Sequence, residues 1–141
     1  MKFLRQKRID LNGIDSRWPD ECHILVGTKG FREVQGVARA FTRLSYKTEK
    51  IEILSRKLEN RIANEDDAQA LENMFNQLDK YQEEGEKLSD EMLSLMLKIA
   101  KESFISGVIF DTETGKDRTM TASDIELFDT EVLMRVTKSV L

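Results

Sequence analysis

The last third of the chain constrains the fold most. An apolar run covers residues 104–110, a polar Gly-containing segment follows over 111–117, and a helix start comes at 121–124. An apolar run that ends in such a polar segment is typical of a β-strand and its turn. Residues 104–141 therefore predict a strand and turn followed by short helices, and this part of the chain contains no reactive group.

The N-terminal part predicts a small β-hairpin. Polar and apolar residues alternate over 8–11, Asn12-Gly13 is a turn signal, and 22–26 forms a second apolar segment. Trp18-Pro19 interrupts the chain between the two strands. We expect Trp18 to cover one end of this hairpin.

The middle of the chain has the residue spacing of amphipathic helices. Apolar residues recur three or four positions apart over three segments, 31–44, 51–62 and 71–81. Within this region, residues 47–82 predict two charged helices that are joined by a turn at 64–67 and project as a hairpin from a globular body.

A separate, more buried helix is expected after the hairpin. Gly85 breaks the apolar pattern, and Ser89 is suited to cap a helix over 89–104 that is apolar on most sides. This helix has more apolar surface than a small domain can cover, so we expect a homo-oligomer. Gly36 is disfavoured inside a helix, and we expect it to mark a close contact between helices.

These segments together predict a mainly helical α+β fold. It consists of a small N-terminal β-hairpin, a helix bundle with the charged hairpin, and a C-terminal strand and turn with short helices. A chain of 141 residues can bury a core without disulfides, so we expect a single domain over 1–141.

The composition argues against an enzyme. Cys22 and His23 are the only residues of their types, so neither an internal disulfide nor a zinc site with three or four Cys and His ligands can form. Adjacent strand residues point to opposite faces, which prevents these two from acting as nucleophile and base. We expect Cys22 to be a small buried group and His23 a hydrogen-bonded strand residue, with no catalytic residue, metal or cofactor.

The sequence also predicts a cytoplasmic protein. The segment 1–8 is positively charged, but no apolar stretch follows it, so we expect no signal peptide. No segment approaches the ~20 apolar residues of a membrane helix.

The charge distribution leaves a nucleic-acid alternative open. Residues 1–50 contain 11 Lys and Arg against 6 Asp and Glu, whereas 51–141 contain 11 against 20. The candidates for phosphate contacts are Lys2, Arg5, Lys7, Arg8, Arg17, Arg32, Arg39 and Arg43. The isoelectric point near 5.2 argues against a dedicated nucleic-acid binder.

Four segments and a tryptophan carry a resemblance to a known family. The segments are Lys7-Arg8-Ile9-Asp10-Leu11, Gly107-Val108-Ile109-Phe110-Asp111-Thr112-Glu113-Thr114-Gly115-Lys116, Met120-Thr121-Ala122-Ser123-Asp124-Ile125-Glu126-Leu127-Phe128 and Glu131-Val132-Leu133-Met134-Arg135-Val136. With Trp18 and the helical middle, they resemble small tail assembly chaperones of long-tailed bacteriophages and prophages.

The resemblance implies a non-enzymatic role in the host cytoplasm. Such proteins bind the long, hydrophobic tape measure protein and help tail tube protein polymerise around it. The partner-binding candidates are apolar residues of the second half of the helical region: Met74, Met92, Leu93 and Met96. The alternatives are a structural virion or connector component, and a nucleic-acid-binding accessory protein that uses the basic N-terminal half.

Overall fold

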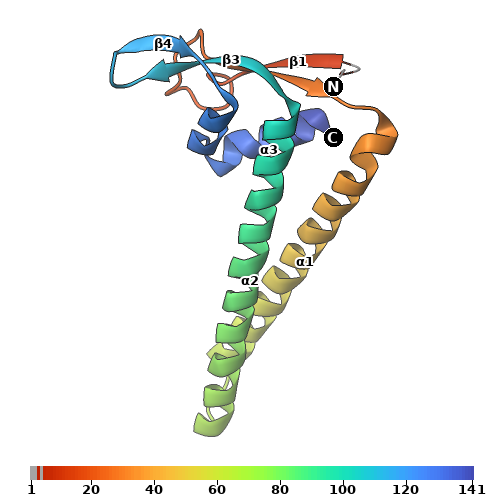
Figure 1. The fold of residues 1–141 in the computed structure, drawn as a ribbon. Helices are drawn as coiled ribbons and strands as arrows, with labels where there is room; N and C mark the ends of the chain where they lie inside the picture. The colour runs from red at the N-terminus through yellow and green to blue at the C-terminus, as the bar shows by residue number, and fades with distance from the viewer. Residues whose placement is uncertain (1–2, 4) are drawn as a thin grey trace. The chain divides into compact units, whose positions relative to one another are not determined.

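The computed structural model describes residues 3 and 5–141, with only the backbone for 31–33. The elements, in chain order, are β1 (Arg5–Asp10), β2 (His23–Thr28), α1 (Phe31–Ala63), α2 (Ala68–Ser103), β3 (Phe104–Asp111), β4 (Lys116–Thr119), the 3-10 helix η1 (Ala122–Leu127) and α3 (Thr130–Val140) (Figure 1). This is a mainly helical α+β fold, as the sequence predicts.

The four strands form one antiparallel sheet in the order β1-β2-β3-β4. The expected N-terminal hairpin is the β1–β2 pair, in which Ile9 lies opposite Ile24. The expected C-terminal strand is β3, and the expected turn contains Gly115, whose φ of 69° suits glycine. This turn leads into a further strand, β4, which pairs with β3. The β2–β3 pairing, which places Ile24 opposite Gly107, merges the two hairpins into one sheet.

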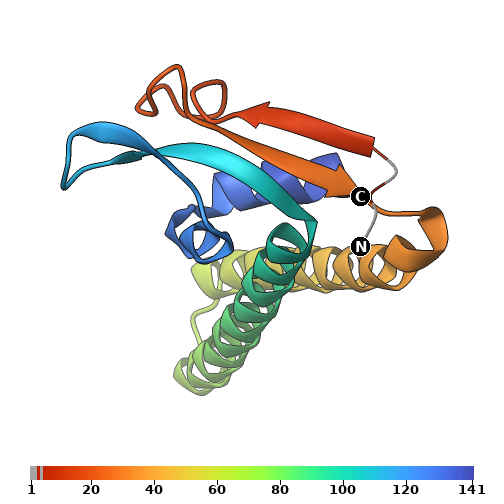
Figure 2. The same cartoon turned by 45° about the horizontal axis from the view of Figure 1, so that its top comes forward.

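Helix α3 covers one face of this sheet (Figures 1 and 2). Asp129 caps α3, because its carboxylate accepts a hydrogen bond of 3.0 Å from the amide of Val132. The apolar face of α3 is buried through Val132, Leu133, Val136 and Val140.

The middle of the chain forms two long helices, and the expected breaks within it are wrong. The turn at 64–67 is confirmed, since Asp67 accepts a hydrogen bond of 2.8 Å from the amide of Ala70 and caps α2. However, α2 runs through Gly85 and Ser89, so no separate helix begins at 89. One glycine costs a helix only about 1 kcal/mol, which a long packed helix can absorb.

Gly36 does not mark a close helix contact. No described atom outside its own helix backbone lies within 4 Å of the position that a Cβ at Gly36 would take. The chain divides into two compact units: unit 1 comprises 1–38 with 94–141, and unit 2 comprises Arg39–Leu93. The expectation of one domain over 1–141, with a hairpin that projects from its body, stays a prediction.

Candidate partner-binding surfaces

One apolar surface of unit 1 is hollowed and open to solvent. We call it the aromatic patch and define it by Trp18, Pro19, Phe110 and Leu127. The hollow has a volume of about 350 Å³. Leu127 is 68% exposed and Phe110 is 37% exposed, although both side chains are large and apolar. Covering them with a partner's apolar surface is therefore favourable.

The loop between β1 and β2 holds Trp18 in place. The side-chain amide of Asn12 donates a hydrogen bond of 2.6 Å to the carbonyl of Trp18. The amide of Trp18 in turn donates to the carbonyl of Asp15 at 3.0 Å. The indole meets the buried ring of Phe128 edge to face, with ring centroids 6.1 Å apart. Trp18 is thus a fixed anchor at the patch.

The position of Leu127 follows from its neighbours. Leu127 is the last residue of η1, Phe128 is buried, and Asp129 caps α3. These two neighbours are held by the core and by the cap, whereas Leu127 itself stays in solvent. Phe110 lies on β3, which brings a third segment to the patch.

A charged rim borders the aromatic patch. Arg17 and Asp15 form an ion pair of 2.6 Å there, and Asp129 adds a second carboxylate. The hydrogen bonds from Arg17 hold the pKa of Asp15 below its usual value. The Arg17 side chain is 85% exposed, so this pair adds little stability. The pair keeps both side chains charged at the edge of the aromatic patch.

Unit 2 is an antiparallel helical hairpin with a heptad seam. Within it, the residues that are buried or half-buried recur every three or four positions on both helices. On α1 they include Phe41, Leu44, Thr48, Ile51, Ser55, Leu58 and Ile62, and on α2 they include Leu71, Met74, Leu78, Tyr81, Gly85, Leu88 and Met92. Ala40, Leu54, Ala70 and Gln77, each of which directly precedes one of these residues, are also half-buried. This spacing is that of the a and d positions of a coiled coil.

A groove runs along one side of this seam. Its apolar lining consists of Ile51, Leu54, Tyr81 and Leu88. Its charged lining consists of Lys47, Lys50, Glu84, Lys87 and Glu91. The volume is about 500 Å³, and the groove is open to solvent. It forms a second candidate surface, which we call the hairpin groove.

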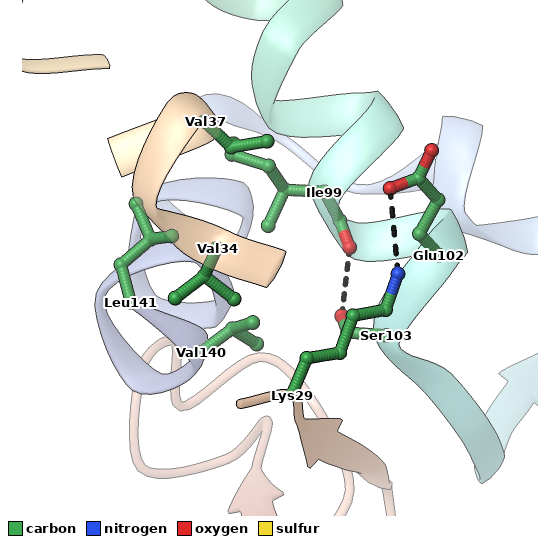
Figure 3. Close-up of a pocket in the computed structure, with 8 residues that line it drawn as sticks. All are labelled: Lys29, Val34, Val37, Ile99, Glu102, Ser103, Val140 and Leu141. Atoms are coloured by element: carbon green, nitrogen blue, oxygen red, sulfur yellow. Dashed lines mark hydrogen bonds and ion pairs between the residues drawn. The ribbon is translucent and has the colours of Figure 1, made fainter. Parts of the chain in front are cut away.

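A small cavity in unit 1 is too small for a ligand. Valine, isoleucine and leucine side chains from α1, α2 and the end of the chain line it, as Figure 3 shows. Lys29 and Glu102 approach to 3.8 Å at its edge, and the hydroxyl of Ser103 donates to the carbonyl of Ile99 at 2.8 Å. Its volume of about 30 Å³ holds about one water molecule, far below that of a ligand pocket.

The four partner-binding residues predicted from the sequence have different surroundings. Met96 is 1% exposed and lies in unit 1, and Met74 is 9% exposed in the hairpin seam. Met92 is half-buried in the seam, and Leu93 beside it is 39% exposed. The structure therefore does not gather the four on one surface, and Leu93 is the most accessible of them. Their role in partner binding stays a prediction.

Cys22 and His23 take the places expected of them. Cys22 is fully buried, and burial raises the pKa of its thiol. Nδ1 of His23 lies 3.0 Å from the carbonyl oxygen of Glu21. In the described part of the chain, no three His, Cys, Asp or Glu side chains gather as a metal site would require.

The basic residues of the N-terminal half do not form one cluster. Arg5, Lys7 and Arg8 are exposed on the edge strand β1, where Arg8 pairs with Asp10 at 2.9 Å. Arg39 and Arg43 belong to unit 2, and Arg17 is engaged by Asp15. Lys2 and the side chain of Arg32 lie outside the described residues. The nucleic-acid alternative stays an untested prediction.

Sequence reasoning missed both surfaces. Leu127 stands between Glu126 and Phe128, two residues after Ile125, and nothing in this segment distinguishes the exposed Leu127 from the buried Ile125 and Phe128. The heptad seam was hidden because Thr48, Ser55 and Gly85 occupy three of its positions. Because these three residues are not large and apolar, the pattern of apolar residues alone does not show the full heptad repeat.

Comparison of the chain with protein-family models, curated proteins and solved structures gave no match. No helix in the described residues is both long enough and apolar enough to cross a membrane.

Proposed function

We propose that this protein is a non-enzymatic tail assembly chaperone of a long-tailed bacteriophage or prophage. In the host cytoplasm it binds the tape measure protein, keeps it dissolved, and aids assembly of the tail tube protein around it. The observation that carries the proposal is the aromatic patch, where Leu127 and Phe110 are exposed beside the fixed ring of Trp18.

The patch also lies where the resemblance is found. Phe110 and Leu127 belong to two of the segments that resemble tail assembly chaperones, 107–116 and 120–128. Trp18 is the tryptophan that contributes to the same resemblance. The residues that carry the resemblance therefore include the three large apolar side chains of one surface. This agreement supports a role for that surface in binding.

An apolar client fits the chemistry of the patch. Full burial of one large aliphatic or aromatic side chain contributes about 1.5–3 kcal/mol, and a few such anchors supply most of the affinity of an interface. A helix of the tape measure protein that inserts an apolar side chain between Phe110 and Leu127 would bury both. The charged rim leaves the patch wettable when no client is bound.

The test is co-expression with an apolar helical fragment of the tape measure protein that is insoluble alone. Wild-type protein should keep the fragment in the soluble fraction. Leu127→Asp should abolish this, because an unpaired carboxylate in the interface costs several kcal/mol, about a hundredfold or more in affinity. Leu127 is 68% exposed, so the free protein should fold normally, and circular dichroism checks this.

The matched control is Ile53→Asp. Ile53 is an exposed aliphatic residue of unit 2, 40% accessible, and its substitution should leave the client soluble. Leu93→Asp tests the surface predicted from the sequence. If Leu93→Asp abolishes the solubility of the client and Leu127→Asp does not, the client site lies on α2. If the wild type never keeps the fragment soluble, the chaperone proposal fails and a structural virion component is favoured.

A further inference from the structure

The two arms of the helical hairpin have opposite charge. The α1 arm, 39–63, carries seven Lys and Arg against three Asp and Glu. The α2 arm, 68–93, carries two against seven, so the net charges are +4 and −5. One face of each arm is occupied by the seam, and the charged side chains are exposed around it.

The charged side chains of the two arms form no ion pairs within the hairpin. Across Arg39–Leu93, all of which the structure describes, no Lys or Arg nitrogen lies within 4.0 Å of an Asp or Glu oxygen. The basic arm and the acidic arm are thus both free to pair with a partner.

The hairpin groove has the same asymmetry of charge between its α1 side and its α2 side. Lys47 and Lys50 line it from α1, whereas Glu84 and Glu91 line it from α2, together with a single opposing charge on Lys87. Between these two edges lie the apolar side chains of Ile51, Leu54, Tyr81 and Leu88. A partner for this groove needs an apolar strip with an acidic edge on one side and a basic edge on the other.

A second copy of the chain meets this requirement. We propose that two copies pack groove to groove, so that four helices enclose the apolar strips of both. The two-fold axis runs along the hairpins, because this arrangement lays the α1 arm of one copy over the α2 arm of the other. A two-fold axis across the hairpins would instead place basic arm on basic arm, which like charges oppose.

The resulting interface is isologous, so each contact occurs twice. Lys47 and Lys50 of each copy face Glu84 and Glu91 of its partner, and the two apolar strips meet between them. Neighbouring helices are antiparallel throughout, as in a four-helix bundle. This inference is independent of the proposed client and uses unit 2, whereas the client surface lies in unit 1.

The test is sedimentation of the full chain and of charge-reversed variants over a wide concentration range. Wild type should dimerise, and more weakly at high salt. The basic-edge variant Lys47→Glu/Lys50→Glu should be monomeric, and so should the acidic-edge variant Glu84→Lys/Glu91→Lys, each at least about a hundredfold weaker in self-association. Mixing the two variants should yield a heterodimer, and combining all four changes in one chain should restore the homodimer.

The mixture also controls for folding, because two unfolded variants could not form the heterodimer. Arg39→Glu/Arg56→Glu changes the charge of α1 by the same amount outside the groove lining and should leave the dimer intact. The proposal is overturned if wild type is monomeric at every concentration. It is equally overturned if either edge variant dimerises like wild type, or if the mixture stays monomeric.

Discussion

At the scale of single residues, Asp124 ties β4 to η1. Its carboxylate accepts hydrogen bonds of 2.7 and 2.9 Å from the guanidinium of Arg118 and one of 2.7 Å from the amide of Thr121. Asp124 is 9% exposed. The bonds from Arg118, and then the bond from Thr121, hold the pKa of Asp124 well below its usual value.

This depressed pKa makes the stability of unit 1 fall in acid. Because the folded state holds the charged form, the contribution of Asp124 is fully present above its unfolded pKa, about 4, and is lost as pH falls through the lower folded pKa. Asp124→Asn should therefore cost about 1–3 kcal/mol at neutral pH. Urea unfolding at several pH values should show this difference shrinking below pH ~4.

Other carboxylates titrate in the same range, so the difference between wild type and variant is the informative quantity. Arg118→Gln should also lower the stability at neutral pH, since it leaves the carboxylate of Asp124 without its main partner. A difference that stays constant down to the acid limit would contradict the assigned role of Asp124.

At the scale of elements, Gly85 shows how the hairpin tolerates a helix-breaking residue. It occupies a seam position of α2, and a Cβ there would lie 3.8 Å from Cγ2 of Ile51, an ordinary contact distance. Gly85→Ala should therefore stabilise the hairpin by up to about 1 kcal/mol, through helix propensity and the added contact. The urea midpoint of the helical circular dichroism signal measures this.

The same substitution at Gly115 is the contrasting control. Gly115 has a φ of 69°, in the left-handed region, so an alanine there should cost about 1 kcal/mol although no described atom crowds the site. If Gly85→Ala destabilises the protein instead, the seam at Ile51 is packed more tightly than these distances imply.

Local signals in the sequence predicted the ends of elements better than their continuity. The turn at 64–67 and a turn after the apolar run 104–110 were predicted, because each depends on neighbouring residues only. The uninterrupted α2 was not predicted, because the cost of a single glycine is small compared with the packing of a long helix, and that packing cannot be read from the residues next to Gly85.

The strand order of the sheet and the composition of the aromatic patch could not be predicted from signals between neighbouring residues. Pairing of β2 with β3 joins Ile24 to Gly107, two positions separated by the whole helical region. The patch likewise combines Trp18, Phe110 and Leu127 from three separate segments. Neither periodicity nor turn chemistry specifies which distant segments meet, so only the folded chain reveals these groupings.

At the scale of the whole molecule, the two units differ in how deeply they bury side chains. Among the described residues, the large side chains that are less than 2% exposed, including Ile24, Met96 and Leu133, all lie in unit 1. In unit 2 the most buried side chains are Leu88, Leu58 and Met74, at 6%, 7% and 9%. Thr48, Ser55 and Gly85 further reduce the apolar content of the seam.

Burial of apolar surface is the dominant favourable term in folding, so we expect unit 2 to open before unit 1. Native-state hydrogen exchange should show amides in the middle of α1 and α2 exchanging by a lower-energy opening than those of Ile24 and Ile109 in the sheet. The measurement belongs at a concentration where the chain sediments as a monomer, because a second copy on the hairpin groove would stabilise unit 2 by mass action.

Raising the protein concentration then separates the stability of unit 2 in the monomer from the stabilisation of unit 2 by a second copy. If the second copy covers the groove, protection should rise at 47–54 and 81–91 and stay unchanged in the sheet, and Lys47→Glu/Lys50→Glu should remove the rise. Equal opening energies in both units at low concentration would contradict the difference in burial as the cause. In that case the hairpin and the sheet would unfold as one cooperative structure, held together by the helices that pass from one unit into the other.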